Sequence, residues 1–341
     1  MACADDAPAP GVIDWLLEED NPSVRYLTLT RLLGRPPSDP EAALAKRRII
    51  ETGWAARALD GLADGEGRNP ARFYLDKYAG AVWQLIILAE HAADGSDGRI
   101  RAACEDLLAR SQDPESGGFS VNQRAGGKGG RHGEVIPCLT GNMAWSLLQL
   151  GYGDDGRVRG ALEWIVAYQR FDDGADEAPS GWPYHRFEVC WGRHSCHMGA
   201  VKALKALSAV PEERRTPGMK ARIDEGVAYL LAHSVYRKSH DPGKTAKPGW
   251  LKFQFPLMYQ TDVLEIVGIL ADLSVRDSRM DDALGVIRSK RTEAGTWNLE
   301  ATFNGKFGEA IERKGRPSKW ITYRALRVLD FYGGPAPAGT E

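Results

Sequence analysis

The 341-residue chain lacks any block of basic residues and any long apolar run. Its 44 Lys and Arg side chains are balanced by 46 Asp and Glu side chains, which leaves a net charge of -2 at pH 7. Nucleic acids and anionic membrane surfaces are bound through clustered positive charge, so neither is predicted as a partner. The first ten residues have no signal-peptide pattern, and no apolar stretch approaches the length of a membrane span. We therefore expect a cytoplasmic protein without a transmembrane segment.

Cysteine is scarce, and its count of five is odd. In a reducing compartment, thiols serve as metal ligands, catalytic groups or core residues more often than as disulfides. We expect no structural disulfide.

Two thiols and two imidazoles nevertheless gather within residues 190–197, directly before the apolar run 200–207. They belong to Cys190, His194, Cys196 and His197. Thiolate sulfur and imidazole nitrogen are ligands that favour zinc, and the start of a helix would fix their geometry. The alternative is a cluster of buried small residues, since free cysteine is commonly buried. The segment is a candidate zinc centre.

Helical periodicity recurs along the chain as a pair of helices, one apolar and one amphipathic, followed by a turn containing glycine and an aromatic residue. The expected apolar helices span 77–93, 139–150, 199–207 and 262–273; the expected amphipathic helices span 99–110, 157–169, 223–231 and 280–289; further helices are expected at 11–17, 23–33, 40–62 and 320–329. The turn aromatics are Phe119, Trp182, Trp250 and Trp297. We expect all four to be buried between repeats. Helix pairs of this kind must stack on neighbours, either as a closed ring with the apolar helices inside or as an open solenoid.

These repeats make residues 76–329 resemble the α/α-toroid proteins, which include squalene and hopene cyclases and the β subunits of protein prenyltransferases. The resemblance is carried by the turns Gln112 to Phe119, Gln169 to Trp182, and Gly295-Thr296-Trp297. It implies an all-α fold in which about six inner and outer helix pairs form one toroid domain over residues 1–341. It also implies an apolar, isoprenoid small-molecule substrate in a central cavity. It implies nothing about a partner subunit.

In protein prenyltransferases, zinc is held by an Asp-x-Cys pair and by the histidine of a later Tyr-His-Thr segment. Here His194-Ser195-Cys196 lies at the matching place, and Tyr259-Gln260-Thr261 has glutamine where the family has histidine. The resemblance therefore implies zinc at His194 and Cys196, with further ligands from Cys138, Cys190, His197 or Asp262. Three thiolates and one histidine would fill the shell as a structural site, whereas Cys196, His194 and Asp262 would leave one position open for chemistry.

The cyclases protonate an alkene with an acid of an Asp-x-Asp-Asp motif, and no such motif begins an apolar helix here. Asp76 and Asp262 are candidate single acids, each with a helix cap as the alternative. With Tyr259 they form our set of candidate catalytic residues. The candidate aromatics for the substrate cavity, where π faces would bind an apolar chain, are Trp83, Trp145, Trp191, Trp320 and Tyr323. Their alternative role is core packing between helices.

The leading hypothesis is an enzyme that acts on an isoprenoid substrate with a Cys/His zinc centre. The alternatives are a metal-free terpenoid cyclase or isomerase that uses one Asp acid, a non-catalytic binding protein with a structural metal site, and a glycan-processing enzyme. A diphosphate group could meet the basic residues Lys252, Arg313, Lys314, Arg316, Lys319 and Arg324. A solvated charged face is the interpretation that we prefer for them.

Overall fold

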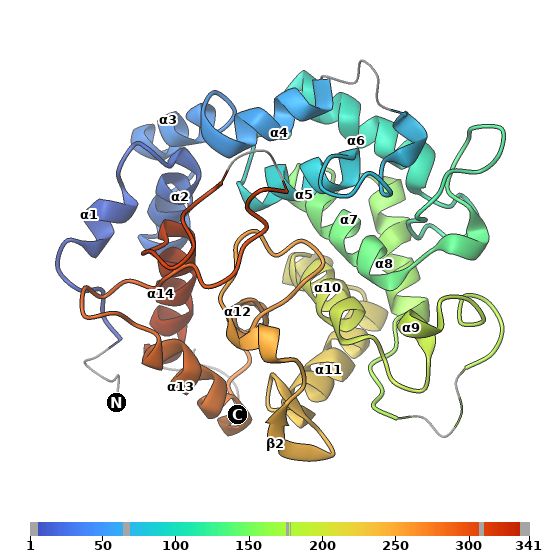
Figure 1. Cartoon of the computed structure of the whole chain (residues 1–341). Helices are drawn as coiled ribbons and strands as arrows, with labels where there is room; N and C mark the ends of the chain where they lie inside the picture. The colour runs from blue at the N-terminus through green and yellow to red at the C-terminus, as the bar shows by residue number, and fades with distance from the viewer. Residues whose placement is uncertain (1–5, 64–68, 175–176, 178, 307–309, 335–341) are drawn as a thin grey trace. The chain divides into compact units, whose positions relative to one another are not determined.

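The computed structural model describes residues 6–63, 69–174, 177, 179–306 and 310–334. These residues are mostly helical (Figure 1). The helices are α1 (Val12–Leu16), α2 (Pro22–Leu27), α3 (Pro40–Arg48), α4 (Gly53–Ala63), α5 (Ala81–Glu90), α6 (Gly98–Ser111), α7 (Pro137–Gln149), α8 (Gly156–Tyr168), α9 (Glu188–Trp191), α10 (His197–Ser208), α11 (Pro217–Ala232), α12 (Val263–Asp272), α13 (Asp281–Ser289) and α14 (Lys319–Gly333). The strands β1 (Arg237–Lys238) and β2 (Asp241–Thr245) form an antiparallel hairpin. The all-α part of the prediction is confirmed.

The chain divides into two compact units. Unit 1 comprises residues 1–46, 230–257 and 262–341, and unit 2 comprises residues 47–229 and 258–261. Within the described residues, no helix is long and apolar enough to cross a membrane. The closed toroid and the single domain over residues 1–341 stay predictions, as does the cytoplasmic location.

In unit 2 the apolar helices pack on one another, and the amphipathic helices pack outside them. Helix α7 contacts α10 most extensively and also contacts α5 (Figure 1). Helix α6 packs against α5, and α8 packs against α7. Every residue of α5 from Val82 to Glu90 is buried, whereas α6 buries only one side. The difference arises because α5 has apolar residues around most of its circumference, whereas α6 has them on one side only.

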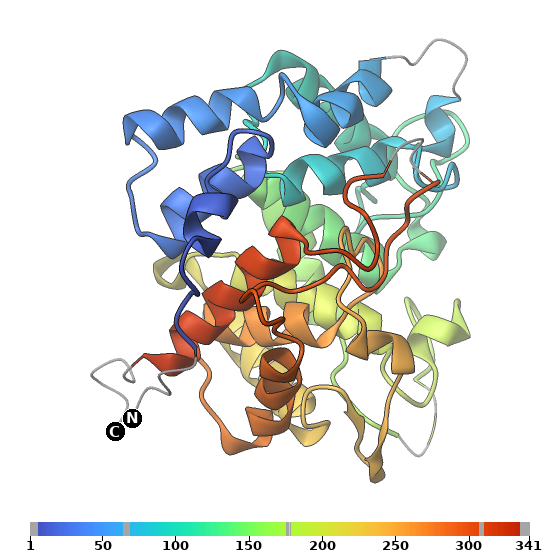
Figure 2. The same cartoon turned by 60° about the vertical axis from the view of Figure 1, so that its left-hand side comes forward.

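In unit 1 the last helix of the chain lies beside helices from its beginning. Helix α14 packs on α12, and in Figure 2 the two lie side by side. It also contacts α1 and α2. The Lys319 ammonium at the start of α14 is buried and bridges Glu18 and Asp20. This pairing removes Lys319 from the residues that could meet a diphosphate.

The turn aromatics are buried as predicted in three of four cases: Phe119 and Trp297 are 0% exposed and Trp250 is 2% exposed. Two of the turns make the same kind of contact, a hydrogen bond to a threonine hydroxyl. The backbone N–H of Phe119 donates to Thr140 Oγ1 at 2.9 Å, and that of Trp297 donates to Thr322 Oγ1 at 3.0 Å. Each threonine lies in the first turn of the helix that follows, so the turn fixes where that helix starts.

For Trp182 the prediction of full burial is wrong, because this side chain is half-buried. Its ring stacks on the His132 ring with 4.2 Å between centroids, and its Nε1 donates to His132 O at 2.8 Å. Trp182 therefore connects two long loops and does not pack between two helices.

Several predicted helices differ in their bounds; α11, for example, begins at Pro217 and not at residue 223. Glycines explain two of the differences. The expected helix 40–62 is two helices, α3 and α4, separated at Gly53, whose φ of 69° is in the left-handed region. The expected helix 77–93 begins only at Ala81. A Cβ on Gly80 would lie 2.3 Å from Phe73 O, so the preceding turn packs tightly against this glycine. Asp76 therefore lies in that turn and is not at the head of a helix.

Candidate functional site

Three cysteines of unit 2 form the thiol cluster Cys138, Cys190 and Cys196. Cys138 lies in the first turn of α7, Cys190 in α9, and Cys196 is the N-cap residue of α10. Burial raises the pKa of Cys138, and the nearby Cys190 and Cys196 raise it further. Burial and then Cys196 raise the pKa of Cys190 to about 12. Thiols from three separate segments are thus within electrostatic reach of one another, and Cys138 and Cys190 are uncharged at neutral pH.

An aromatic cluster of Tyr74, Trp83 and Tyr259 lies beside these thiols. The Tyr259 ring centroid is 4.9 Å from that of Trp83 and 5.8 Å from that of Tyr74. Trp83 Nε1 donates to Tyr74 O at 3.0 Å, which fixes the indole. Burial raises the pKa of Tyr74, and the nearby Cys138 and Cys190 raise it further. Burial also raises the pKa of Tyr259, and there Tyr74 and Cys138 add to the rise. The rings contact one another, and the thiols of Cys138 and Cys190 lie within electrostatic range of them in unit 2.

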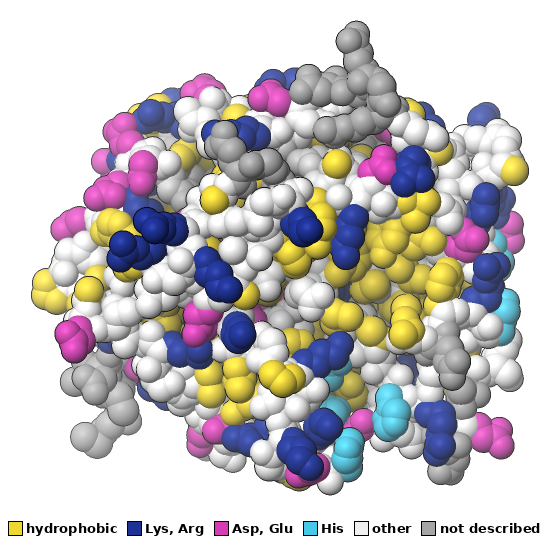
Figure 3. Space-filling view, viewed as in Figure 1, with side chains coloured by type: hydrophobic (Ala, Val, Ile, Leu, Met, Phe, Trp, Pro, Cys, Tyr) yellow, Lys and Arg dark blue, Asp and Glu magenta, His cyan; other side chains and the backbone are white. Residues whose placement is uncertain are grey.

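Large apolar side chains are exposed at positions next to this group in the chain. Leu75, beside Tyr74, is 45% exposed; Val189, beside Cys190, is 87% exposed; Phe187 is 38% exposed. Figure 3 shows hydrophobic side chains gathered over the region where Figure 1 draws α7, α8 and α10. An apolar area of this kind is typical of a surface that binds something apolar.

The two predicted histidine ligands are directed to other partners. The His194 side chain is 67% exposed, and its Nδ1 lies 3.4 Å from Asp173 Oδ1. His197 Nδ1 and the Tyr229 hydroxyl are 3.1 Å apart, and their rings are in contact. Within the described ranges, no three His, Cys, Asp or Glu side chains are placed to hold a metal ion. The thiol donors fit zinc in type but not in spacing, and zinc stays a prediction.

Asp262, a candidate acid, caps a helix in unit 1. Its Oδ1 accepts from Glu265 N at 2.8 Å and its Oδ2 from Gln254 N at 2.9 Å, and the residue is 2% exposed. Asp76, in unit 2, is half-buried and pairs with Arg72 at 2.6 Å. Asp262 is therefore a helix cap, and Asp76 forms an ion pair.

The buried Asp262 should make stability depend on pH. Burial raises its pKa to about 6, although the two N–H donors and Arg324 act in the opposite direction and Glu265 adds to the rise. Because the folded chain then binds a proton more tightly than the unfolded chain, stability is highest below pH 4 and falls as pH rises to 6. This component should amount to roughly 3 kcal/mol.

Urea unfolding of the wild type and of Asp262→Asn at several pH values between 4 and 7 tests this expectation. The difference between the two free energies of unfolding should decrease from pH 4 to pH 6 and stay constant above it. Other acids titrate equally in both proteins and cancel. A difference that is independent of pH, or that increases with pH, would contradict the expectation.

Of the five aromatics predicted to line a cavity, Trp83 is in the aromatic cluster. Trp145 carries the Lys205 ammonium 3.7 Å above its ring, and Lys205 pairs with Glu90 at 2.6 Å, which ties α5, α7 and α10 together. The others have core neighbours: Trp191 packs on Trp164 and Tyr184, Trp320 stacks on Phe255, and Tyr323 is buried. Trp83, Trp145 and Trp191 belong to unit 2, and Trp320 and Tyr323 to unit 1.

Tyr74 and Asn142 belong to the group but were not singled out from the sequence. Asn142 follows Cys138 by four residues and precedes Ser146 by four, so all three lie on one face of α7. Polar residues at helical spacing in a buried helix are the signal that would have found Asn142. No such signal marks Tyr74, which reaches the cluster from the irregular turn before α5.

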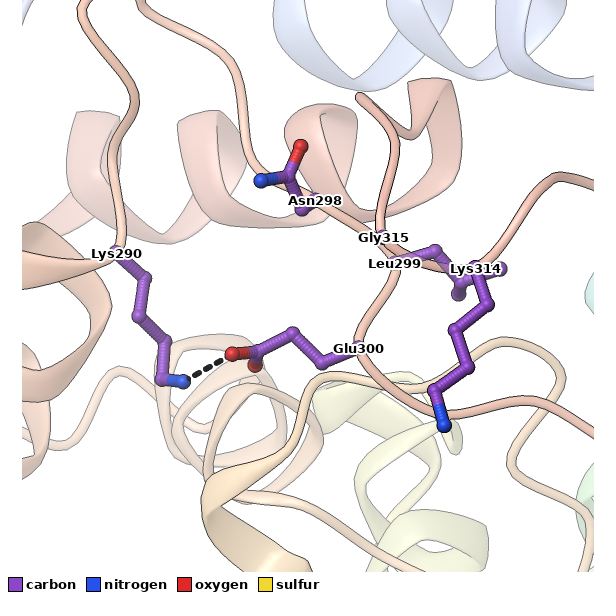
Figure 4. A pocket seen from close by; sticks show the side chains of 6 residues that line it. All are labelled: Lys290, Asn298, Leu299, Glu300, Lys314 and Gly315. Atoms are coloured by element: carbon purple, nitrogen blue, oxygen red, sulfur yellow. Dashed lines mark hydrogen bonds and ion pairs between the residues drawn. The ribbon is translucent and has the colours of Figure 1, made fainter.

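A separate cavity in unit 1 has a volume of about 240 Å³ (Figure 4). It is lined by Lys290, Asn298, Leu299, Glu300, Lys314 and Gly315. Figure 4 shows Lys290 and Glu300 pointing toward each other, and their Nζ and Oε1 atoms are 2.6 Å apart. Glu300 neutralises Lys290, and Lys314 is the residue that this lining shares with the predicted diphosphate-binding set.

A comparison of the sequence with known protein families finds no match, and a comparison with curated proteins also finds none.

Proposed function

We propose that the protein is an enzyme of the α/α-toroid type that acts on an apolar, isoprenoid-like small molecule bound at the aromatic cluster of unit 2. The observation that supports this is the contact of Tyr74 and Trp83 with Tyr259 within electrostatic range of the thiol cluster, with apolar side chains exposed at neighbouring positions of the chain. Ligand sites are mostly apolar and aromatic, with a few placed polar groups. This group has that composition.

The aromatic rings provide the binding energy in this proposal. A buried aromatic side chain removes 150–250 Å² from water, and a ligand chain packed against three rings gains from the same effect. Ring faces also attract cationic charge, which matters for isoprenoid chemistry through carbocations. The rings therefore suit both the substrate and its reaction.

The thiols limit what the site does without a cofactor. Cys138 and Cys190 have raised pKa values, so both are protonated thiols at neutral pH. A protonated thiol is a poor nucleophile. A bound cation stabilises thiolates, and zinc is the cofactor that we propose. Since the side chains do not converge on one point as placed, we assign zinc no step in the reaction.

The second candidate is a non-catalytic binding protein. It is favoured by the raised pKa values of Tyr74, Tyr259, Cys138 and Cys190, which leave the group neutral and without a base. A metal-free cyclase or isomerase would have to rely on Asp262, both of whose carboxylate oxygens accept backbone N–H groups. Metal content separates these candidates.

Binding of farnesol, followed by isothermal titration calorimetry, tests the apolar site. Trp83→Ala should weaken the affinity at least tenfold, because it removes an aromatic face worth more than about 1.4 kcal/mol. Trp182→Ala, a half-buried tryptophan of the same unit outside the cluster, is the matched control. Equal affinity of the wild type and Trp83→Ala, or no binding at all, would contradict the proposal.

The same protein, expressed with zinc in the medium, should contain zinc that is lost in Cys196→Ala. Acidification should release it, because protons compete with the metal for thiolate and imidazole. Lys205→Met, which leaves the thiol cluster intact, is the control. Purified wild type that takes up no zinc would contradict both the zinc enzyme and a binding protein with a structural metal site, and would favour the metal-free cyclase or isomerase.

A further inference from the structure

One face of α7 carries buried polar groups that make no hydrogen bond. Asn142 is 2% exposed and Ser146 is 1% exposed. Asn142 Nδ2, Ser146 Oγ and the Tyr259 hydroxyl are all buried and have no hydrogen-bond partner among the described residues. A buried polar group without a partner destabilises a protein, because it has lost its hydrogen bonds to water. Folded proteins therefore keep few of them, and several in one place require an explanation.

Two of these groups meet at the aromatic cluster. Asn142 is close enough to lower the pKa of the Tyr259 hydroxyl, against the larger effect of burial. The geometry of the pair nevertheless does not form a hydrogen bond, since both atoms remain unpartnered. The hydroxyl and the amide nitrogen thus lie near each other, and each has a hydrogen that it can donate to a ligand oxygen.

We propose that the ligand of this site is an apolar molecule that carries one neutral acceptor oxygen, a ketone, aldehyde or ester carbonyl, which accepts hydrogen bonds from Tyr259 Oη and Asn142 Nδ2. This inference rests on the proposed function and specifies its substrate class. The rings of Trp83 and Tyr74 bind the apolar part. The carbonyl oxygen gives both donors the partner that the protein does not supply.

Other ligand classes fit the group less well. A pure hydrocarbon would leave both donors without a hydrogen bond, so binding it would not remove the unfavourable free energy of burying them. A diphosphate or a carboxylate would need a counter-charge when buried, and none of Tyr74, Trp83, Cys138, Asn142 and Tyr259 supplies one.

The test compares geranylacetone, an isoprenoid ketone, with β-farnesene, an isoprenoid hydrocarbon, by calorimetry. Tyr259→Phe and Asn142→Leu should each weaken geranylacetone binding about tenfold or more, and should leave β-farnesene binding unchanged. Tyr152→Phe removes a hydroxyl that donates to Arg101 O elsewhere in unit 2, and it should change neither affinity. Because Tyr259→Phe removes an unpartnered group, it should not lower the melting temperature of the free protein.

Infrared spectroscopy of the wild type gives a readout that needs no variant. The carbonyl stretch of bound geranylacetone should lie at lower frequency than in an alkane solvent, as for a hydrogen-bonded carbonyl. An unshifted stretch, or a Tyr259→Phe variant that weakens both ligands equally or neither, overturns the inference and leaves the apolar site standing. A wild type that binds neither ligand overturns both the inference and the proposed function.

Discussion

Trp297→Ala is expected to lower the free energy of unfolding by roughly 3–5 kcal/mol. The indole is 0% exposed, and its Nε1 donates to Ile287 O at 2.7 Å. Truncation leaves a cavity and removes the shorter of two hydrogen bonds to Ile287 O, which keeps only the Lys290 N–H at 3.3 Å. The turn also fixes the start of α14 through Thr322, so the loss should extend to the packing of α14 on α12. Urea unfolding measured by circular dichroism gives the value.

Trp182→Ala is the matched control for Trp297→Ala. Both tryptophans lie in a glycine-containing turn that ends a helix pair, but Trp182 is half-buried and connects loops. Its truncation should cost less than half as much. Thr322→Val, which keeps the shape of the side chain and removes the acceptor for the Trp297 N–H, should cost about 1–3 kcal/mol. If Trp297→Ala unfolds like the wild type, these aromatics do not hold the repeats together.

The helices of this protein could be predicted because their apolar periodicity is long and regular. Helix α5 is apolar on every side and is buried on every side, as its sequence indicates. The errors occur where backbone contacts between distant residues decide a boundary. Gly80 begins α5 late because it packs on Phe73 O, and no residue pattern reports such a contact. The hairpin β1–β2 was also not foreseen, because its two strands are short and mostly polar.

The candidate site was predictable in its thiols and not in its neighbours. Cys138 was grouped with Cys190 and Cys196 because each precedes or begins an apolar helix, and all three interact. The histidines next to them in sequence point to Asp173 and Tyr229, since at a helix start adjacent side chains point in different directions. Spacing along a chain identifies residues at one helix end but not the direction of each side chain.

The loop before α7 depends on a buried carboxylate that the sequence did not single out. Asp113 is 0% exposed and accepts hydrogen bonds from Arg124 at 3.1 Å, from Ser116 Oγ at 2.6 Å and from two backbone N–H groups. Its Oδ2 is also 2.7 Å from His132 Nδ1, and His132 stacks on Trp182. One carboxylate thus connects the Gly117-Gly118-Phe119 turn, residues 124–132 and the loop that carries Trp182.

Asp113→Ala should therefore lower the free energy of unfolding by roughly 3 kcal/mol, the lower end of the range for removing one partner of a buried pair. The lower end applies because the side chains of Arg124 and His132 reach solvent and can be hydrated. Glu115→Ala is the matched control: this carboxylate also binds Arg124, but it is 58% exposed, and its loss should cost less than about 1 kcal/mol. Tryptophan fluorescence should change in Asp113→Ala as His132 is released from the Trp182 ring, and should stay the same in Glu115→Ala. Equal destabilisation by the two variants would show that Asp113 does not organise these loops.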